Sequence, residues 1–104
     1  MRFFLISDNI DTRMGFRLSG VEGVVVHEPA EFREAFAAAL ADESIGVVLV
    51  TEKLVNLCPD EVRDAKLNKS IPLVVEIPDR HGTFKPGEAI GAYIRDAIGI
   101  KILD

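Results

Sequence analysis

Residues 45–52 read Ile-Gly-Val-Val-Leu-Val-Thr-Glu, an apolar run that ends in two polar residues. A run of this length without alternation is typical of a strand buried on both faces, as in a parallel sheet. Similar short runs occur at residues 3–6, 24–26 and 73–77. Polar or helix-forming stretches separate these four runs. The alternation of strand and helix predicts a parallel α/β sheet.

The stretches on either side of this run carry helix signals. Pro29 suits the first turn of a helix, because its missing N–H would be unpaired there in any case. Phenylalanines and alanines follow it at helical spacing, so we predict a helix from about residue 29 to residue 42. Thr51 is placed to cap a short second helix, which Pro59 then breaks or restarts.

The remaining segments differ in how clearly their sequence predicts a helix or a strand. The first crossover, residues 12–19, contains apolar residues but is interrupted by glycine, so its pattern is the least regular. Pro72 cannot donate to a strand ladder, so the fourth strand should begin there or lie at a sheet edge. From Pro86 onward, a C-terminal helix is predicted by apolar residues at helical spacing, namely Ile90, Tyr93, Ile94, Ala97 and Ile98.

The predicted fold is a small, doubly wound, four-stranded parallel sheet, Rossmann-like or receiver-like, with helices on both faces and a C-terminal helix. The length of 104 residues fits a single domain. We divide it into an α/β core over residues 1–78 and a loop, helix and tail over residues 79–104.

Composition excludes several classes of function. The net charge is −5 and no cluster of Lys and Arg offsets it, which disfavours binding to nucleic acid or to anionic lipid. No apolar run approaches the roughly 18 residues that a membrane span requires, so direct membrane insertion is not expected. The first apolar run is also too short for a signal peptide, which favours a cytoplasmic location.

Ligands of such sheets bind outside the carboxyl ends of the strands. Asp8 and Asp11 could hold Mg²⁺ there, like the acidic pair of a receiver domain. A receiver also needs an aspartate to accept phosphate at the end of its third strand, where this chain has Thr51 and Glu52. We therefore interpret Asp8 as a turn residue that hydrogen-bonds its local backbone.

The remaining reactive side chains form no recognisable catalytic set. His27 and His81 lie on separate predicted loops, with no paired nucleophile, and are interpreted as solvated. Cys58 is the single cysteine and is interpreted as a small buried apolar residue. The glycine spacing matches neither nucleotide-binding fingerprint. We predict no catalytic residue, no cofactor and no metal site.

Residues 7–23 read Ser-Asp-Asn-Ile-Asp-Thr-Arg-Met-Gly-Phe-Arg-Leu-Ser-Gly-Val-Glu-Gly. This stretch resembles the first-loop pattern of the F subunits of vacuolar/archaeal-type (V/A-type) rotary ATPases. The Thr-Glu ending of the third strand and the Glu-Ile-Pro ending of the fourth are similar to that family as well. The residues that carry the resemblance are Asp8, Thr12, Gly15, Phe16, Leu18, Gly20, Thr51, Glu52, Glu76, Ile77 and Pro78.

Packing offers a second account of the central part of this pattern. Gly15 and Gly20 would let a first helix pack closely on the sheet or turn sharply. Phe16 and Leu18 are then candidates for the core. This account is compatible with the resemblance, because a core motif can also identify a fold.

The resemblance implies a non-catalytic protein of the central stalk that binds the coiled-coil shaft, which is the D subunit. Such a protein helps couple ATP synthesis or hydrolysis to proton or sodium transport and can change ATPase activity. Further candidate partners are the C subunit of the membrane-side stalk and the catalytic A/B head, and ATP would bind the A subunits. The expected location is cytoplasmic, at the periphery of a membrane-bound complex.

The C-terminal helix is the candidate contact with the shaft. Its predicted interface consists of Ile90, Tyr93, Ile94 and Ile98, and Gly82 and Gly87 are candidate hinges. Two alternatives stay open at this point. One is a receiver-like, protein-binding signalling domain that lacks the phosphoacceptor aspartate, and the other is a small-molecule enzyme of the flavodoxin-like type.

Overall fold

A sheet of four parallel strands runs through the computed structural model, which describes residues 2–68 and 71–78. The strands are β1 (Arg2–Ser7), β2 (Glu22–Val25), β3 (Ile45–Thr51) and β4 (Leu73–Ile77), and their order is β2-β1-β3-β4. The helices are α1 (Ile10–Leu18), α2 (Pro29–Ala41), α3 (Glu52–Leu57) and α4 (Pro59–Asn68). The predicted parallel α/β fold is confirmed.

The apolar runs are not all buried to the same depth. β3 lies between β1 and β4, and all of its residues are buried. β2 is an outer strand, and Val24 and Val25 are only half-buried. The expectation that every run is covered on both faces is therefore wrong for Val24 and Val25, whereas Val26, directly after β2, is buried.

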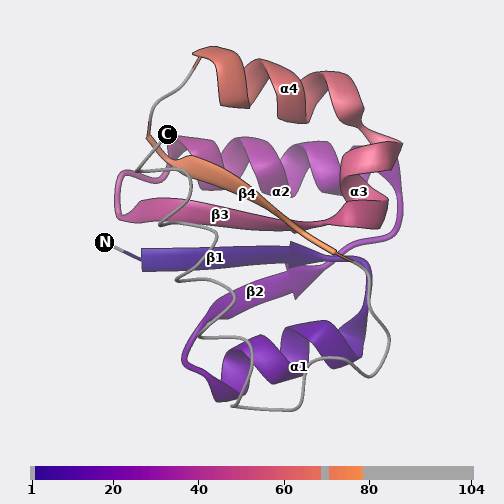
Figure 1. Ribbon diagram of the computed structural model, residues 1–104, viewed down its shortest axis with the longest axis vertical. Coiled ribbons are helices and arrows are strands. Elements are labelled where there is room, and N and C mark those ends of the chain that lie inside the picture. The colour runs from indigo at the N-terminus through magenta and orange to yellow at the C-terminus, as the bar shows by residue number, and fades with distance from the viewer. Residues whose placement is uncertain (1, 69–70, 79–104) are drawn as a thin grey trace.

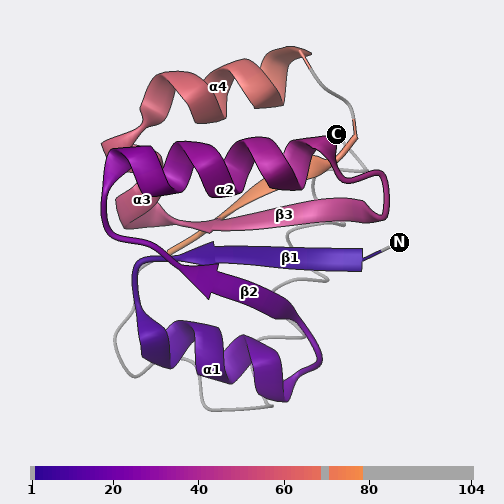
Figure 2. The same cartoon turned by 180° about the vertical axis from the view of Figure 1, so that it is seen from behind.

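Helices cover the sheet on both faces (Figure 1). In Figure 1, β4 passes in front of α2, whereas in Figure 2, seen from behind, α2 lies in front of β4. The core on the side of α2, α3 and α4 includes Ile6, Phe32, Phe36, Val48, Val50, Leu54, Cys58, Val62 and Val74. The core on the side of α1 consists of Leu5, Phe16, Val47, Leu49, Val75 and Ile77.

Helix α1 forms despite its glycine. The side chain of Asn9 accepts hydrogen bonds from the backbone N–H groups of Asp11 (2.7 Å) and Thr12 (3.2 Å), which caps the helix at its first turn. Gly15 lies inside the helix and is buried. The predicted crossover at residues 12–19 is therefore a continuous helix that begins at Ile10.

The end of α1 depends on Gly20. Its backbone has φ of +89°, the left-handed region that favours glycine. The N–H of Gly20 donates to the carbonyl of Arg17, and the N–H of Val21 donates to the carbonyl of Phe16, both at 2.9 Å. These two bonds form a Schellman motif, which satisfies the last carbonyls of the helix. The predicted sharp turn at Gly20 is confirmed.

One core prediction on α1 is wrong. Phe16 is completely buried, but Leu18 is 70% exposed. Two residues that are two positions apart on a helix point about 200° apart, so only one of them can face the sheet. Gly15 is buried beside Phe16.

Helix α2 follows its sequence signals closely. It begins at Pro29 and ends at Ala41, one residue before the predicted end. Glu31 accepts hydrogen bonds from the backbone N–H groups of His27 (3.2 Å) and Glu28 (3.1 Å). The bond from His27 contributes most to lowering the pKa of Glu31. A lowered pKa in the folded state means that this contact stabilises the fold above the unfolded pKa and is lost as the pH falls.

The later elements agree with the sequence as far as they are described. Pro59 separates α3 from α4, and β4 begins directly after Pro72 and is an outer strand of the described sheet. The predicted loop, helix and tail at residues 79–104 lie outside the described residues. So do His81 and the candidate residues Gly82, Gly87, Ile90, Tyr93, Ile94 and Ile98. No helix among the described residues is long and apolar enough to cross a membrane.

Candidate functional site

The carboxyl ends of β1 and β3 are the first place to look for a ligand site. The chain leaves β1 toward β2 on one side and later returns to β3 on the other side. This reversal makes the gap between β1 and β3 the topological switch point, where ligands of open parallel sheets bind. Ser7 ends β1, Asp8 and Asn9 follow it, and Thr51 ends β3.

At the end of β1, the side chains of Ser7 and Asn9 hydrogen-bond to backbone groups two or three residues further along the chain. Ser7 Oγ is buried, accepts from the N–H of Asn9 and donates to the carbonyl of Asn9, both at 2.9 Å. Asn9 in turn caps α1. The local turn residue is therefore Asn9, and the prediction that gave this role to Asp8 is wrong. The sequence does contain a signal for this cap, because Asn9 stands two residues before Asp11, and an asparagine followed by an acidic residue is typical of a helix start.

Asp8 reaches across the switch point instead. The hydroxyl of Thr51 donates to Asp8 Oδ1 at 2.7 Å, and the backbone N–H of Asp8 donates to Thr51 Oγ1 at 3.2 Å. Thr51 is almost fully buried and makes no side-chain cap bond to α3. Thr51 is the N-cap residue of α3, as predicted, but its side chain bonds across the sheet and not to the helix. These two residues are 43 positions apart and tie the carboxyl ends of β1 and β3 together.

We expect Thr51→Val to lower the free energy of unfolding by about 1–3 kcal/mol, because the near-isosteric valine leaves half-buried Asp8 without its side-chain partner. Equilibrium unfolding in urea measures this loss. Thr51→Ser keeps the hydroxyl and is the matched control, so it should retain most of the lost stability. A Thr51→Val variant that is as stable as the unaltered chain would show that this hydrogen bond does not stabilise the fold.

The other residues of the sequence pattern do not gather at this point. Glu52 is exposed at the first position of α3, and Glu76 is exposed on β4. Ile77 is buried in the core on the α1 side, and Pro78 follows it half-buried. Thr12 is half-buried on α1. The pattern therefore consists mostly of residues that shape the fold, and Asp8 and Thr51 are the pair that meets at the switch point.

Cys58 and His27 are the other candidate reactive side chains among the described residues. Burial raises the pKa of the Cys58 thiol, which keeps it protonated within the core beside α2, α3 and α4. The interpretation of Cys58 as a buried apolar residue is confirmed. His27 is exposed, as expected for a solvated loop residue. Among residues 2–68 and 71–78, no three His, Cys, Asp or Glu side chains are grouped so that they could hold a metal ion.

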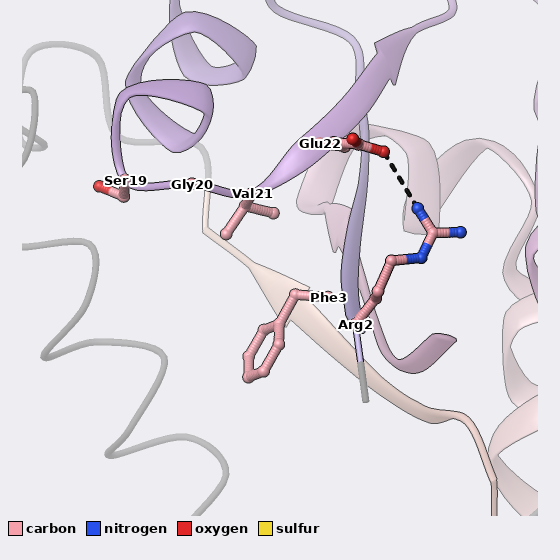
Figure 3. A pocket seen from close by; sticks show the side chains of 6 residues that line it. All are labelled: Arg2, Phe3, Ser19, Gly20, Val21 and Glu22. Carbon is pink, nitrogen blue, oxygen red and sulfur yellow. Dashed lines mark hydrogen bonds and ion pairs between the residues drawn. The ribbon is translucent and has the colours of Figure 1, made fainter. Parts of the chain in front are cut away.

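An open pocket of about 430 Å³ lies at the opposite end of the strands. Figure 3 shows its lining residues, which are Arg2, Phe3, Ser19, Gly20, Val21 and Glu22. Arg2 is the one cationic side chain among these lining residues, so it is the group that could bind an anionic ligand here. Its guanidinium is already paired with Glu22 at 3.0 Å and with Asp42 at 2.8 Å. Its Nε also donates to the hydroxyl of Ser44 at 3.0 Å.

These contacts give Arg2 a structural role. It joins the start of β1 to β2 and to the turn that precedes β3. Hydrogen bonds from Ser44 hold the pKa of Asp42 below its usual value, with a smaller contribution from Arg2. Asp42 therefore stays ionised and keeps its charge for this ion pair. The cation that lines this pocket is thus already engaged by Glu22, Asp42 and Ser44, and the pocket lies beside this group of contacts.

The fold and the switch point define a receiver-like parallel α/β domain whose strand ends are closed by their own hydrogen bonds. A family profile described as "ATP synthase (F/14-kDa) subunit" matches residues 4–94. Because this match covers most of the sequence, the chain belongs to the family of ATP synthase (F/14-kDa) subunits. The family named by the sequence resemblance is thereby confirmed.

Curated relatives agree with this family over nearly the full length. The chain is 31% identical to the F subunit of the A-type ATP synthase of Thermococcus sibiricus, and the alignment covers 98% of each protein. It is 35% identical to the protein of the same name from Methanothermobacter thermautotrophicus over 89% of each. The corresponding F subunit of Methanocaldococcus jannaschii is 30% identical over 98% of this chain and 99% of the relative.

Proposed function

We propose that this chain is the central-stalk F subunit of a V/A-type rotary ATP synthase or ATPase. The observation that carries the proposal is the near-full-length match to proteins named as F subunits of A-type ATP synthases. In this role it is non-catalytic, binds the coiled-coil shaft formed by the D subunit and helps couple ATP synthesis or hydrolysis to proton or sodium transport. It acts in the cytoplasm, at the periphery of a membrane-bound complex.

The chemistry of the described residues supports a binding role. At the switch point, the polar groups that a substrate would need are hydrogen-bonded to each other, as in the Asp8–Thr51 pair. The position of a receiver phosphoacceptor holds Thr51, whose hydroxyl donates to Asp8. A protein with this arrangement is suited to act through its surfaces, and ATP would bind the catalytic A subunits.

The contact with the D subunit would include residues 79–104. The sequence places Ile90, Tyr93, Ile94 and Ile98 on one face of the helix predicted there, and such a face can lie against partner helices. Gly82 and Gly87 would act as hinges ahead of or within the first turn. The membrane-side C subunit and the A/B head are further partners in this proposal, and regulation of ATPase activity would act through the same segment.

Co-expression with the D subunit from the same organism tests this function. We expect a one-to-one complex in size-exclusion chromatography with light scattering, because family members assemble as parts of one complex. Limited proteolysis should show residues 84–104 better protected in the complex than in the free chain. If the chain elutes alone at micromolar concentration, the receiver-like signalling alternative becomes the better hypothesis. Equal proteolysis with and without the D subunit would contradict the role of the C-terminal segment.

A further inference from the structure

Three large apolar side chains lie in a row on the outer face of α1. Ile10, Met14 and Leu18 are 59%, 56% and 70% exposed, and their spacing of four residues places them along one side of the helix. We call this set the α1 ridge. The opposite side of α1 carries buried Gly15 and Phe16 against the sheet. Contacts within the described part of the chain therefore do not explain why the outer side is apolar.

A single exposed apolar residue is ordinary on a protein surface, but a contiguous row indicates an interaction site. The other large apolar residues that are exposed among the described residues are Leu57, Leu67 and Ile71. These three lie on α3, on α4 and in the segment before β4. Among the described residues, α1 is thus the helix that exposes three large apolar side chains at helical spacing.

Two arginines flank the α1 ridge. Arg13 and Arg17 precede Met14 and Leu18 by one residue each, so both lie along the same flank of the ridge. Arg13 donates through Nε to the carbonyl of Gly23 at 3.0 Å. Within residues 2–68 and 71–78, neither of them forms an ion pair, whereas the other described arginines pair as Arg2–Glu22, Arg2–Asp42, Arg33–Glu61 and Arg63–Asp60.

We propose that the α1 ridge is a docking surface for a partner α-helix that carries its own row of apolar residues with carboxylates alongside. The proposal rests on the proposed function, in which the chain assembles on a coiled-coil shaft. A row of residues four apart is the ridge that packs into the groove of another helix. The two arginines of the flank complement acidic side chains beside the partner's apolar row, which fixes the orientation of docking.

The same observations disfavour other occupants. A membrane surface would require a richer set of cations than Arg13 and Arg17, and the chain carries a net charge of −5. A second copy docked with its α1 antiparallel would place the arginine flank against itself, which is repulsive. An acidic amphipathic helix meets neither obstacle.

The size of the α1 ridge sets the expected effect. A stable protein interface buries about 1,600 Å² in total, which is more than three side chains on one helix can supply. The ridge therefore acts together with another contact, and its loss should weaken the complex without abolishing it. For a charge placed in the middle of the ridge we expect the dissociation constant to rise about tenfold to a hundredfold.

Isothermal titration calorimetry with the purified D subunit tests this inference on the full chain. Met14→Glu should raise the dissociation constant by that factor, and Arg17→Glu should weaken binding more at low salt than at high salt. Leu67→Glu, which changes an exposed apolar residue on α4 (76%, against 56% for Met14), is the matched control and should bind like the unaltered chain. All three positions are exposed, so the melting temperatures should agree within a few degrees. Met14→Ser provides a second ridge variant without a new charge.

The outcomes separate this inference from the function on which it rests. If the unaltered chain fails to bind the D subunit, the proposed function is wrong and the docking surface is lost with it. If the unaltered chain binds and Met14→Glu and Met14→Ser bind equally well, only the α1 ridge is refuted. An equal weakening by Leu67→Glu would also refute it, because the effect would then not be specific to α1.

Discussion

Phe16→Ala is expected to lower the free energy of unfolding by about 3–5 kcal/mol. Phe16 is completely buried and is the large side chain with which α1 packs on the sheet, beside Leu5 and Leu49. Truncation removes its apolar surface from the core and leaves a cavity that the rigid strands cannot fill. For a domain of this size, such a loss is a large part of the total stability.

Urea unfolding followed by circular dichroism measures the effect of this substitution. Met14→Ala is the matched control, because it truncates a large apolar residue on the same helix that is 56% exposed. The control should cost less than about 0.5 kcal/mol, as surface substitutions usually do. Similar losses in the two variants would mean that α1 does not pack on the sheet through Phe16.

Gly23→Ala should cost about 3 kcal/mol, at the upper end of the usual range for overpacking. A Cβ atom at this position would lie 2.7 Å from the carbonyl oxygen of Leu5 and 2.8 Å from its Cβ. Leu5 cannot retreat, because β1 is paired with β2 on one side and with β3 on the other. The added methyl group must therefore push β2 away from β1 and weaken the pairing of the outer strand.

Gly20→Ala is an informative comparison for this prediction. No atom lies within 4 Å of a Cβ built at Gly20, but its φ of +89° is unfavourable for alanine. Its cost should be about 1–2 kcal/mol, from backbone strain alone. Thermal or chemical unfolding of both variants measures the two costs. A larger loss for Gly20→Ala than for Gly23→Ala would show that β2 can shift away from β1 more easily than the packing suggests.

The strands and α2 could be predicted because their signals are local. The four apolar runs mark four strands, and Pro29 marks the start of α2. Helix α1 was harder, since Gly15 lowers the helical propensity of a short segment. Gly15 nevertheless lies inside the helix, where it is buried next to Phe16. The exposure of Leu18 follows only once the start and phase of this helix are known.

The contact at the switch point could not be derived from local patterns. Asp8 and Thr51 meet because β1 and β3 are neighbours in register, and the sequence does not state the strand order. Aspartate is common in turns, so the local sequence favours a turn role for Asp8, whereas its carboxylate in fact accepts a hydrogen bond from Thr51. The capping role of Asn9 could have been predicted, since its position just before a helix is a known signal.

The strand order also affects how the chain folds during synthesis. β1 is made first, yet Phe4 pairs with Glu22 of β2 and with Val48 of β3. During synthesis β1 can therefore pair with β2 first, gains β3 as its second neighbour only after α2 has been made, and β4 joins later still. Such non-local pairing slows folding, and an unpaired apolar strand invites aggregation.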